Sequence, residues 1–327
     1  MIKSVSWLCI SAFLGGALLA GAVNERRLSH WAWQPLREIE KSSARNIDSF
    51  IEEKLNKNGL QLSPEADMRT LIRRLTHDLH GLPPTPQAVD AFLADNSPDA
   101  YGKLVDSLLD HPRFGERMTQ HWLDLAHYAD THGFERDKRR PNAWRYRDYV
   151  IKSFNEDKPY LRFLKEQIAG DVIWPEDEDA NVAIGFLAAG PWDFVGQVET
   201  KSPVLRRSAR ALDLDDITTQ VFTSTQAVTI NCARCHDHKL DPISQEEYFR
   251  VSAVFAGNKR DDRTISEAGL KAYEKEKKRL SKELDEAQHE LVQSLGDGLG
   301  LADIVGGGNG TGNGTKGHGL DPRSAKV

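Results

Sequence analysis

A hydroxyl residue followed directly by proline marks the expected starts of three helices, and this recurring arrangement constrains the fold. The three pairs are Ser63-Pro64, Thr85-Pro86 and Ser97-Pro98. A Ser or Thr side chain caps the free N–H groups at a helix start, and proline fits the first turn because its missing N–H is not needed there. After the first segment, apolar residues follow at intervals of three and four: Met68, Leu71, Ile72, Leu75 and Leu79. The pattern predicts amphipathic helices that pack against a shared core.

Further helices are predicted over residues 47–55, 113–129, 142–154 and 213–228, the last of which leads into a pair of cysteines. Asn58-Gly59 and Gly81 are typical helix stops. Ser244 and Glu247 have the spacing of a capping box, which predicts a helix ending near Gly257. No stretch shows the clear alternation of apolar and polar residues expected of a strand. The predicted fold class is therefore mostly α.

The chain has 327 residues, which is enough for one large domain or two smaller ones with a buried core. Charged residues make up 28% of it and the formal net charge is -6. Because the chain has no excess of basic residues to neutralise a phosphate backbone, we expect no nucleic-acid partner.

The first residues have the layout of a secretory signal. Lys3 precedes an apolar run over residues 5–23, and small residues at Ala20-Gly21-Ala22 suit signal peptidase. We therefore predict a signal peptide over residues 1–22, a linker over 23–46, and an exported protein of the periplasm or cell envelope. If the signal stays uncleaved, it is long enough to tether the chain to a membrane. No second span is predicted after it.

The cysteines are the most informative residues for function. Cys9 leaves with the signal, so the mature chain keeps Cys232 and Cys235, which are followed by His236. In an oxidising compartment such a pair is expected to form a disulfide, a metal site or a haem attachment. C-x-x-C-H is the haem-attachment spacing, because two thiols reach the two vinyl groups of one haem and the adjacent histidine becomes the proximal iron ligand. The motif predicts one covalently bound c-type haem.

Two neighbours are candidates for supporting that histidine. The Asp237 carboxylate is placed to accept the free ring proton of the proximal imidazole, and His238 suits a role at the edge of the site. Zinc remains an alternative, because Cys232, Cys235, His236 and His238 are all reasonable ligands, although the four are crowded for one tetrahedron. A thioredoxin-like dithiol is less well matched, because its motif usually follows a strand.

The opposite iron ligand decides between electron transfer and an open, reactive site. His132 is the first candidate because it lies in a turn after a helix, and His121 is the second. Met68 and Met118 are better explained by packing. Arg147, or Arg145 beside it, is a candidate partner for a haem propionate.

The basic segment over residues 136–140 precedes these arginines. It is expected to be a solvated loop, with a haem propionate or an anionic polysaccharide as the alternative partner.

Several of these segments carry a family resemblance. The stretch 231–244 resembles the second planctomycete cytochrome c-like domain, a family of unknown function, and the resemblance extends over residues 47–260. It rests also on 47–60, 81–86, 101–109, 121–124, 128–133, 141–170, 248–249 and 255–257. The resemblance implies an exported protein with a C-x-x-C-H haem site, in a helical domain over 47–260, and implies no known reaction.

Beyond this domain the composition changes. Residues 261–295 are highly charged and carry an imperfect heptad pattern from 266, which predicts a long helix that is either a spacer or a weak partner for another helix. Residues 296–327 are rich in glycine and are expected to be a flexible tail or the truncated start of a further domain.

The sequence thus supports two functions. The first is an exported electron-transfer module with a single haem, which meets redox protein partners through transient contacts. The second is a zinc- or haem-containing enzyme or binding module that acts on extracellular polymers.

Overall fold

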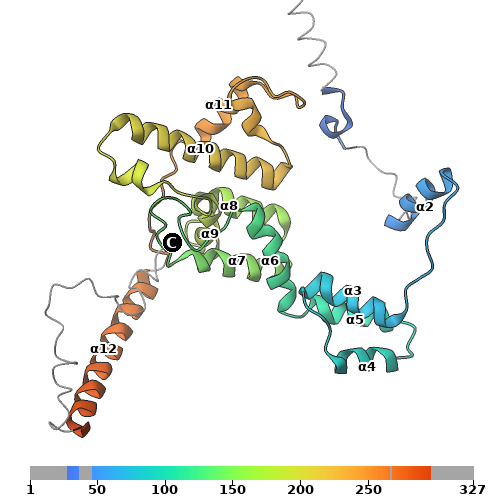
Figure 1. Ribbon diagram of the computed structural model, residues 1–327, viewed down its shortest axis with the longest axis horizontal. Helices are drawn as coiled ribbons and strands as arrows, with labels where there is room; N and C mark the ends of the chain where they lie inside the picture. Colours follow the sequence, from blue (N-terminus) through green and yellow to red (C-terminus); the bar gives the residue numbers. More distant parts are fainter. Residues whose placement is uncertain (1–27, 37–45, 266, 296–327) are drawn as a thin grey trace, which may run out of the picture. The chain divides into compact units, whose positions relative to one another are not determined.

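The computed structural model describes residues 28–36, 46–265 and 267–295, and most of these residues are helical (Figure 1). The described part of the chain contains no strand, and its only bridge pairs Thr131 with Arg139. The predicted mostly helical fold is therefore confirmed. The predicted signal peptide and the Gly-rich tail lie outside the described residues. In the described ranges, no helix has the length and apolar character needed to cross a bilayer.

The chain divides into two compact units. Of the described residues, those up to His111 and Val228–Val254 form unit 1, and Pro112–Ala227 together with those from Phe255 onward form unit 2. The predicted domain over residues 47–260 contributes to both units, and the cysteine motif belongs to unit 1.

Unit 1 contains a small core made by three consecutive helices, α3 (Met68–His80), α4 (Pro86–Ala94) and α5 (Ala100–Leu109), after the separate helix α2 (Ile47–Lys57). Ile72, Phe92 and Ala100 are buried there, and Met68 packs against them. The packing role predicted for Met68 is thus confirmed.

The helix ends of this unit follow local chemistry. Thr85 Oγ1 accepts a hydrogen bond from Ala88 N at 3.2 Å, and Pro86 is the first residue of α4. Gly81 ends α3 in the left-handed conformation, with φ of 70°. The predicted start of α3 at residues 63–65 is wrong, because the Asp67 carboxylate accepts from Thr70 N at 3.0 Å and begins the helix at Met68.

Unit 2 is built on α6 (Arg113–Leu125), α7 (Ala143–Asn155), α8 (Tyr160–Ile173) and α9 (Glu178–Ala183). Trp122 Nε1 lies 2.9 Å from Tyr146 Oη and 2.8 Å from Gln167 Oε1, so α6, α7 and α8 meet at one buried polar contact. Gly170 lets α8 approach α9 closely, since an added Cβ would overlap the carbonyl group of Ala180.

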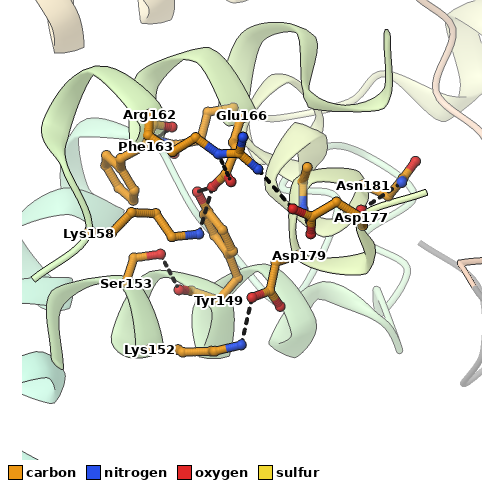
Figure 2. A network of polar contacts seen from close by, with 12 residues as sticks. Tyr149, Lys152, Ser153, Lys158, Arg162, Phe163, Glu166, Asp177, Asp179 and Asn181 are labelled. Atoms are coloured by element: carbon orange, nitrogen blue, oxygen red, sulfur yellow. Dashed lines mark hydrogen bonds and ion pairs between the residues drawn. The ribbon is translucent and has the colours of Figure 1, made fainter. Parts of the chain in front are cut away.

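An ionic network centred on the buried carboxylate of Glu166 links α7, α8 and α9 (Figure 2). Glu166 is 1% exposed and accepts hydrogen bonds from Tyr149 Oη and Lys158 Nζ, both at 2.7 Å, and from Arg162 Nε at 2.5 Å. Arg162 also reaches Asp177 at 2.8 Å, and the Asp177 side chain caps α9. Two residues of the acidic run at 176–179 are therefore structural, because Asp179 in turn pairs with Lys152 at 2.6 Å.

Three helices follow. α10 (Pro203–Gln226) starts ten residues before its predicted start, because Ser202 caps it and Pro203 occupies its first turn. The capping box at Ser244 is confirmed, since Ser244 N donates to Glu247 Oε2 at 2.7 Å and begins α11 (Gln245–Val254). The long charged helix is confirmed as α12 (Glu267–Leu295), and its leucines at 280, 284 and 291 are exposed. A helix partner for α12 stays a prediction.

Candidate functional site

The cysteine pair lies on a short 3-10 helix, η4 (Ile230–Arg234), with Cys235 as its C-terminal cap. Side chains three residues apart eclipse one another in a 3-10 helix. Ile230 and Ala233 are accordingly both buried, at 2% and 0% exposure, while Cys232 and Cys235 are both exposed and free. The two thiols therefore share the outward face, one turn apart.

His236 follows on the same exposed surface. Its Nδ1 lies 2.7 Å from the backbone oxygen of Asp237, which can only accept, so Nδ1 carries the proton and donates. This tautomer leaves the lone pair on Nε2. A histidine that binds a metal usually donates its other ring N–H in this way.

The predicted partner of that proton needs a correction. The backbone carbonyl of Asp237 takes the role that the sequence suggested for its carboxylate. The carboxylate is used elsewhere, since Oδ1 accepts from Gln245 N at 2.9 Å. Asp237 therefore supports the imidazole through its backbone and ties the motif to α11 through its side chain.

Gln245, the first residue of α11, clasps the motif from both sides. Its backbone N–H holds Asp237, and its side-chain Nε2 donates to the carbonyl of Arg234 at 3.0 Å. Gln245 is not among the residues predicted from the sequence, although the capping box at Ser244 marks it as the start of a helix. The backbone N–H of Ser244 donates to Glu247 and lowers the pKa of that carboxyl group.

His238 organises the loop that follows the motif. It is 4% exposed, and its Nδ1 accepts from Asp241 N at 2.8 Å. Its Nε2 lies 3.2 Å from Thr229 Oγ1. The Asp241 carboxylate is also 3.3 Å from Nδ1, but that nitrogen already accepts the N–H of Asp241, so the carboxylate is not its hydrogen-bond partner.

Both ring nitrogens of His238 thus serve the loop. The alternative zinc site, with Cys232, Cys235, His236 and His238 as ligands, would need one of these two nitrogens to bind the metal. Across residues 28–36, 46–265 and 267–295, no three His, Cys, Asp or Glu side chains are grouped to hold a metal ion.

The two histidines predicted as the opposite ligand of the haem iron, His132 and His121, belong to unit 2. His132 is buried, with its ring 5.0 Å from that of Trp192 and 5.9 Å from that of Phe194. Burial, together with the nearby charges of Arg140 and Lys138, lowers its pKa, so the ring is neutral. His121 is exposed on α6, and Met118 is half-buried on the same helix. The opposite iron ligand stays a prediction.

The arginines proposed for a propionate are placed on α7. Arg147 pairs with its neighbour Asp148, at 2.9 Å from Nε and 2.7 Å from Nη2. The Arg145 guanidinium lies 4.8 Å from the centre of the Trp144 ring. Within the basic segment, Arg136, Lys138 and Arg139 are exposed as expected of a solvated loop, whereas Arg140 is half-buried.

Comparisons with known proteins give one match. A family model, PSCyt2, described as a protein of unknown function (DUF1549), matches residues 46–260. No curated protein and no solved structure matches the chain. The matched range is well over half of the chain and includes η4 and the start of α11.

Proposed function

This chain belongs to the PSCyt2 family of unknown function, and on that premise we propose that it is an exported electron-transfer protein. It carries one covalently attached c-type haem at Cys232, Cys235 and His236. The observation that carries the proposal is the shared exposed face of the two thiols, next to an imidazole whose Nε2 lone pair is available.

The residues of the motif have separate roles in this proposal. The two thiols would hold the haem through thioether links, and His236 Nε2 would be its proximal ligand, oriented by the hydrogen bond that Nδ1 donates. Gln245 and His238 hold the backbone on either side, so that the ligand keeps its orientation. When bound, the haem supplies one-electron redox chemistry.

Apolar surface in the same unit supports a large apolar cofactor. Leu240, four residues after His236, is 74% exposed, and α11 exposes Phe249 at 55% and Val254 at 74%. α11 packs against η4. Exposed apolar side chains on α11 and on the loop before it are thus available to pack against an apolar cofactor.

The test is to express the full chain with its N-terminal leader in a host that has cytochrome c maturation machinery, and then to purify it from the periplasm. We expect red protein with the pyridine haemochrome spectrum of a c-type haem, at one haem per chain. Cys232→Ala/Cys235→Ala is expected to lose the covalent haem. His236→Ala is expected to change the axial ligation, as seen in the reduced spectrum.

His77→Ala is the matched control, because His77 is an exposed histidine on α3 of the same unit and is expected to leave the spectrum unchanged. Carbon monoxide binding to the reduced protein then separates a saturated iron, expected for electron transfer, from an open one. Colourless protein with one zinc ion per chain contradicts the proposal and favours the zinc alternative.

A further inference from the structure

A cavity of about 460 Å³ lies within unit 2. Its walls come from the loop that carries His132, the first turn of α7, the segment that carries Trp192, and the chain around Arg260. Pockets for small organic molecules are typically about 300–1,000 Å³, and most are lined by aromatic groups with a few polar ones. Tyr128, Tyr146 and Phe194 provide aromatic surface here.

Four of the residues that line this cavity have buried polar atoms without a hydrogen-bond partner in the described part of the chain. They are both amide atoms of Asn142, His132 Nδ1, Trp192 Nε1 and Arg260 Nη2. Asn142 and His132 are each 8% exposed, and the Arg260 side chain is 9% exposed. About nine in ten buried polar groups in proteins have a hydrogen-bond partner. Four residues around one cavity whose polar atoms lack a partner therefore indicate a ligand that occupies it.

Positive charge is concentrated at one wall. Arg140 donates to the carbonyl oxygens of Ala189 at 2.6 Å and Gly190 at 2.7 Å, and Arg260 donates to the same Gly190 oxygen at 3.0 Å. Two guanidinium groups therefore converge on one carbonyl. Burial and the charge of Arg260 lower the pKa of Arg140 to about 10. The Asp213 carboxylate, 2.9 Å from Arg260, also pairs with Arg210, so an anion in the cavity would relieve this repulsion.

The N-terminus of α7 lies in the same wall. Asn142 is the N-cap of this 13-residue helix, yet its side chain makes no capping hydrogen bond. The free N–H groups and the dipole of a helix start both favour an anion. The idle Asn142 amide and the helix start therefore point to the same kind of ligand.

We propose that this cavity binds a small hydroxylated monocarboxylate, such as a sugar acid. Its carboxylate accepts hydrogen bonds from Arg260 Nη2, Trp192 Nε1 and Asn142 Nδ2, and one of its hydroxyl groups donates to Asn142 Oδ1. Asp261 and Asp262 also line the cavity and disfavour a second negative charge. The cavity belongs to unit 2, whereas Cys232 and Cys235 belong to unit 1.

Isothermal titration calorimetry of the full chain with D-glucuronate, D-glucose and D-glucarate tests the proposal. These probes share a six-carbon hydroxylated skeleton and carry one, zero and two carboxylates. We expect glucuronate to bind with a Kd of about 1 mM or tighter, and at least about tenfold tighter than either of the other two. Glucuronate binding that equals glucose binding, or no binding by glucuronate, overturns the proposal.

Asn142→Ala is the decisive variant, because no hydrogen bond to the chain is lost with its side chain. We expect it to fold with unchanged or higher thermal stability and to bind glucuronate at least about tenfold more weakly. Asn181→Ala is the matched control: this buried amide donates to the carbonyls of Pro175 and Asp177, so it is expected to lose stability and retain binding. If Asn142→Ala keeps full binding, the inference is wrong.

A second arm identifies the source of the carboxylate. Cys232→Ala/Cys235→Ala protein and haem-loaded protein are expected to bind glucuronate equally. Loss of binding on haem loading would assign the cavity to a haem propionate and overturn the free-acid proposal.

Discussion

Glu166→Gln is the sharpest test of the forces that hold unit 2. The carboxylate is 1% exposed and accepts from Lys158, Arg162 and Tyr149, and the Lys158 side chain is only 13% exposed (Figure 2). Removing one member of a buried ion pair costs about 3–5 kcal/mol, because the other charge stays buried. Arg162 is 32% exposed and keeps its ion pair with Asp177 in the variant. We therefore expect a loss of stability at the lower end of this range, about 3 kcal/mol. For a domain of this size that is a fall in Tm of about 6–12 °C.

The pH dependence of the same variant gives an independent check. Burial opposes ionisation of Glu166, but the hydrogen bonds from Lys158, Tyr149 and Arg162 outweigh it and hold its pKa below the ordinary value of 4.5. A lowered pKa in the folded state adds stability that is fully present above pH 4.5 and is lost as the pH falls below it. The difference between wild type and Glu166→Gln should therefore shrink in acid.

Thermal unfolding followed by circular dichroism, at neutral pH and in steps down through pH 4.5, measures both effects. Glu176→Gln, at an exposed position of the same unit, is the matched control and should change stability by less than about 0.5 kcal/mol. The reasoning fails if Glu166→Gln costs less than about 1 kcal/mol, or if its deficit is unchanged in acid.

Gly170→Ala should destabilise the protein by about 1–3 kcal/mol, because the new methyl group overlaps the Ala180 carbonyl. Gly102→Ala has open space around it and should stabilise helix α5 by about 0.5–1 kcal/mol. Chemical denaturation measures the free energy of unfolding of both variants. His238→Ala should cost about 1–3 kcal/mol, because the N–H of Asp241 loses its acceptor, and the loss should be the same with and without a zinc chelator. A loss that appears only when zinc is present would identify His238 as a metal ligand instead.

The sequence predicted those parts of the fold that depend on neighbouring residues. The helix caps are examples: Thr85 with Pro86, Gly81, and Ser244 with Glu247. Each cap involves residues within about one helical turn, so the residue types alone are sufficient to predict it. The same logic was available for α10, where Ser202-Pro203 begins the helix, but the run of polar residues after it obscured the start.

Contacts between distant segments were not visible in the pattern. Lys158, Arg162 and Glu166 look like ordinary surface charges of a helix start, and only the approach of Tyr149 from α7 makes Glu166 a buried centre. Gln245 is a similar case, since its hold on Arg234 depends on how the loop between them folds back. The proposed site residues, Cys232, Cys235 and His236, could be predicted because they lie within five consecutive positions of the chain.

Mass spectrometry of the peptide that contains Cys232 and Cys235, from protein exported by a maturation-competent host, shows whether haem is covalently attached to the chain. We expect one haem bound to this peptide through both sulfur atoms, with neither thiol open to alkylation. A peptide of unmodified mass, with both thiols alkylated or joined as a disulfide, would contradict the assignment of this protein as a c-type haem protein.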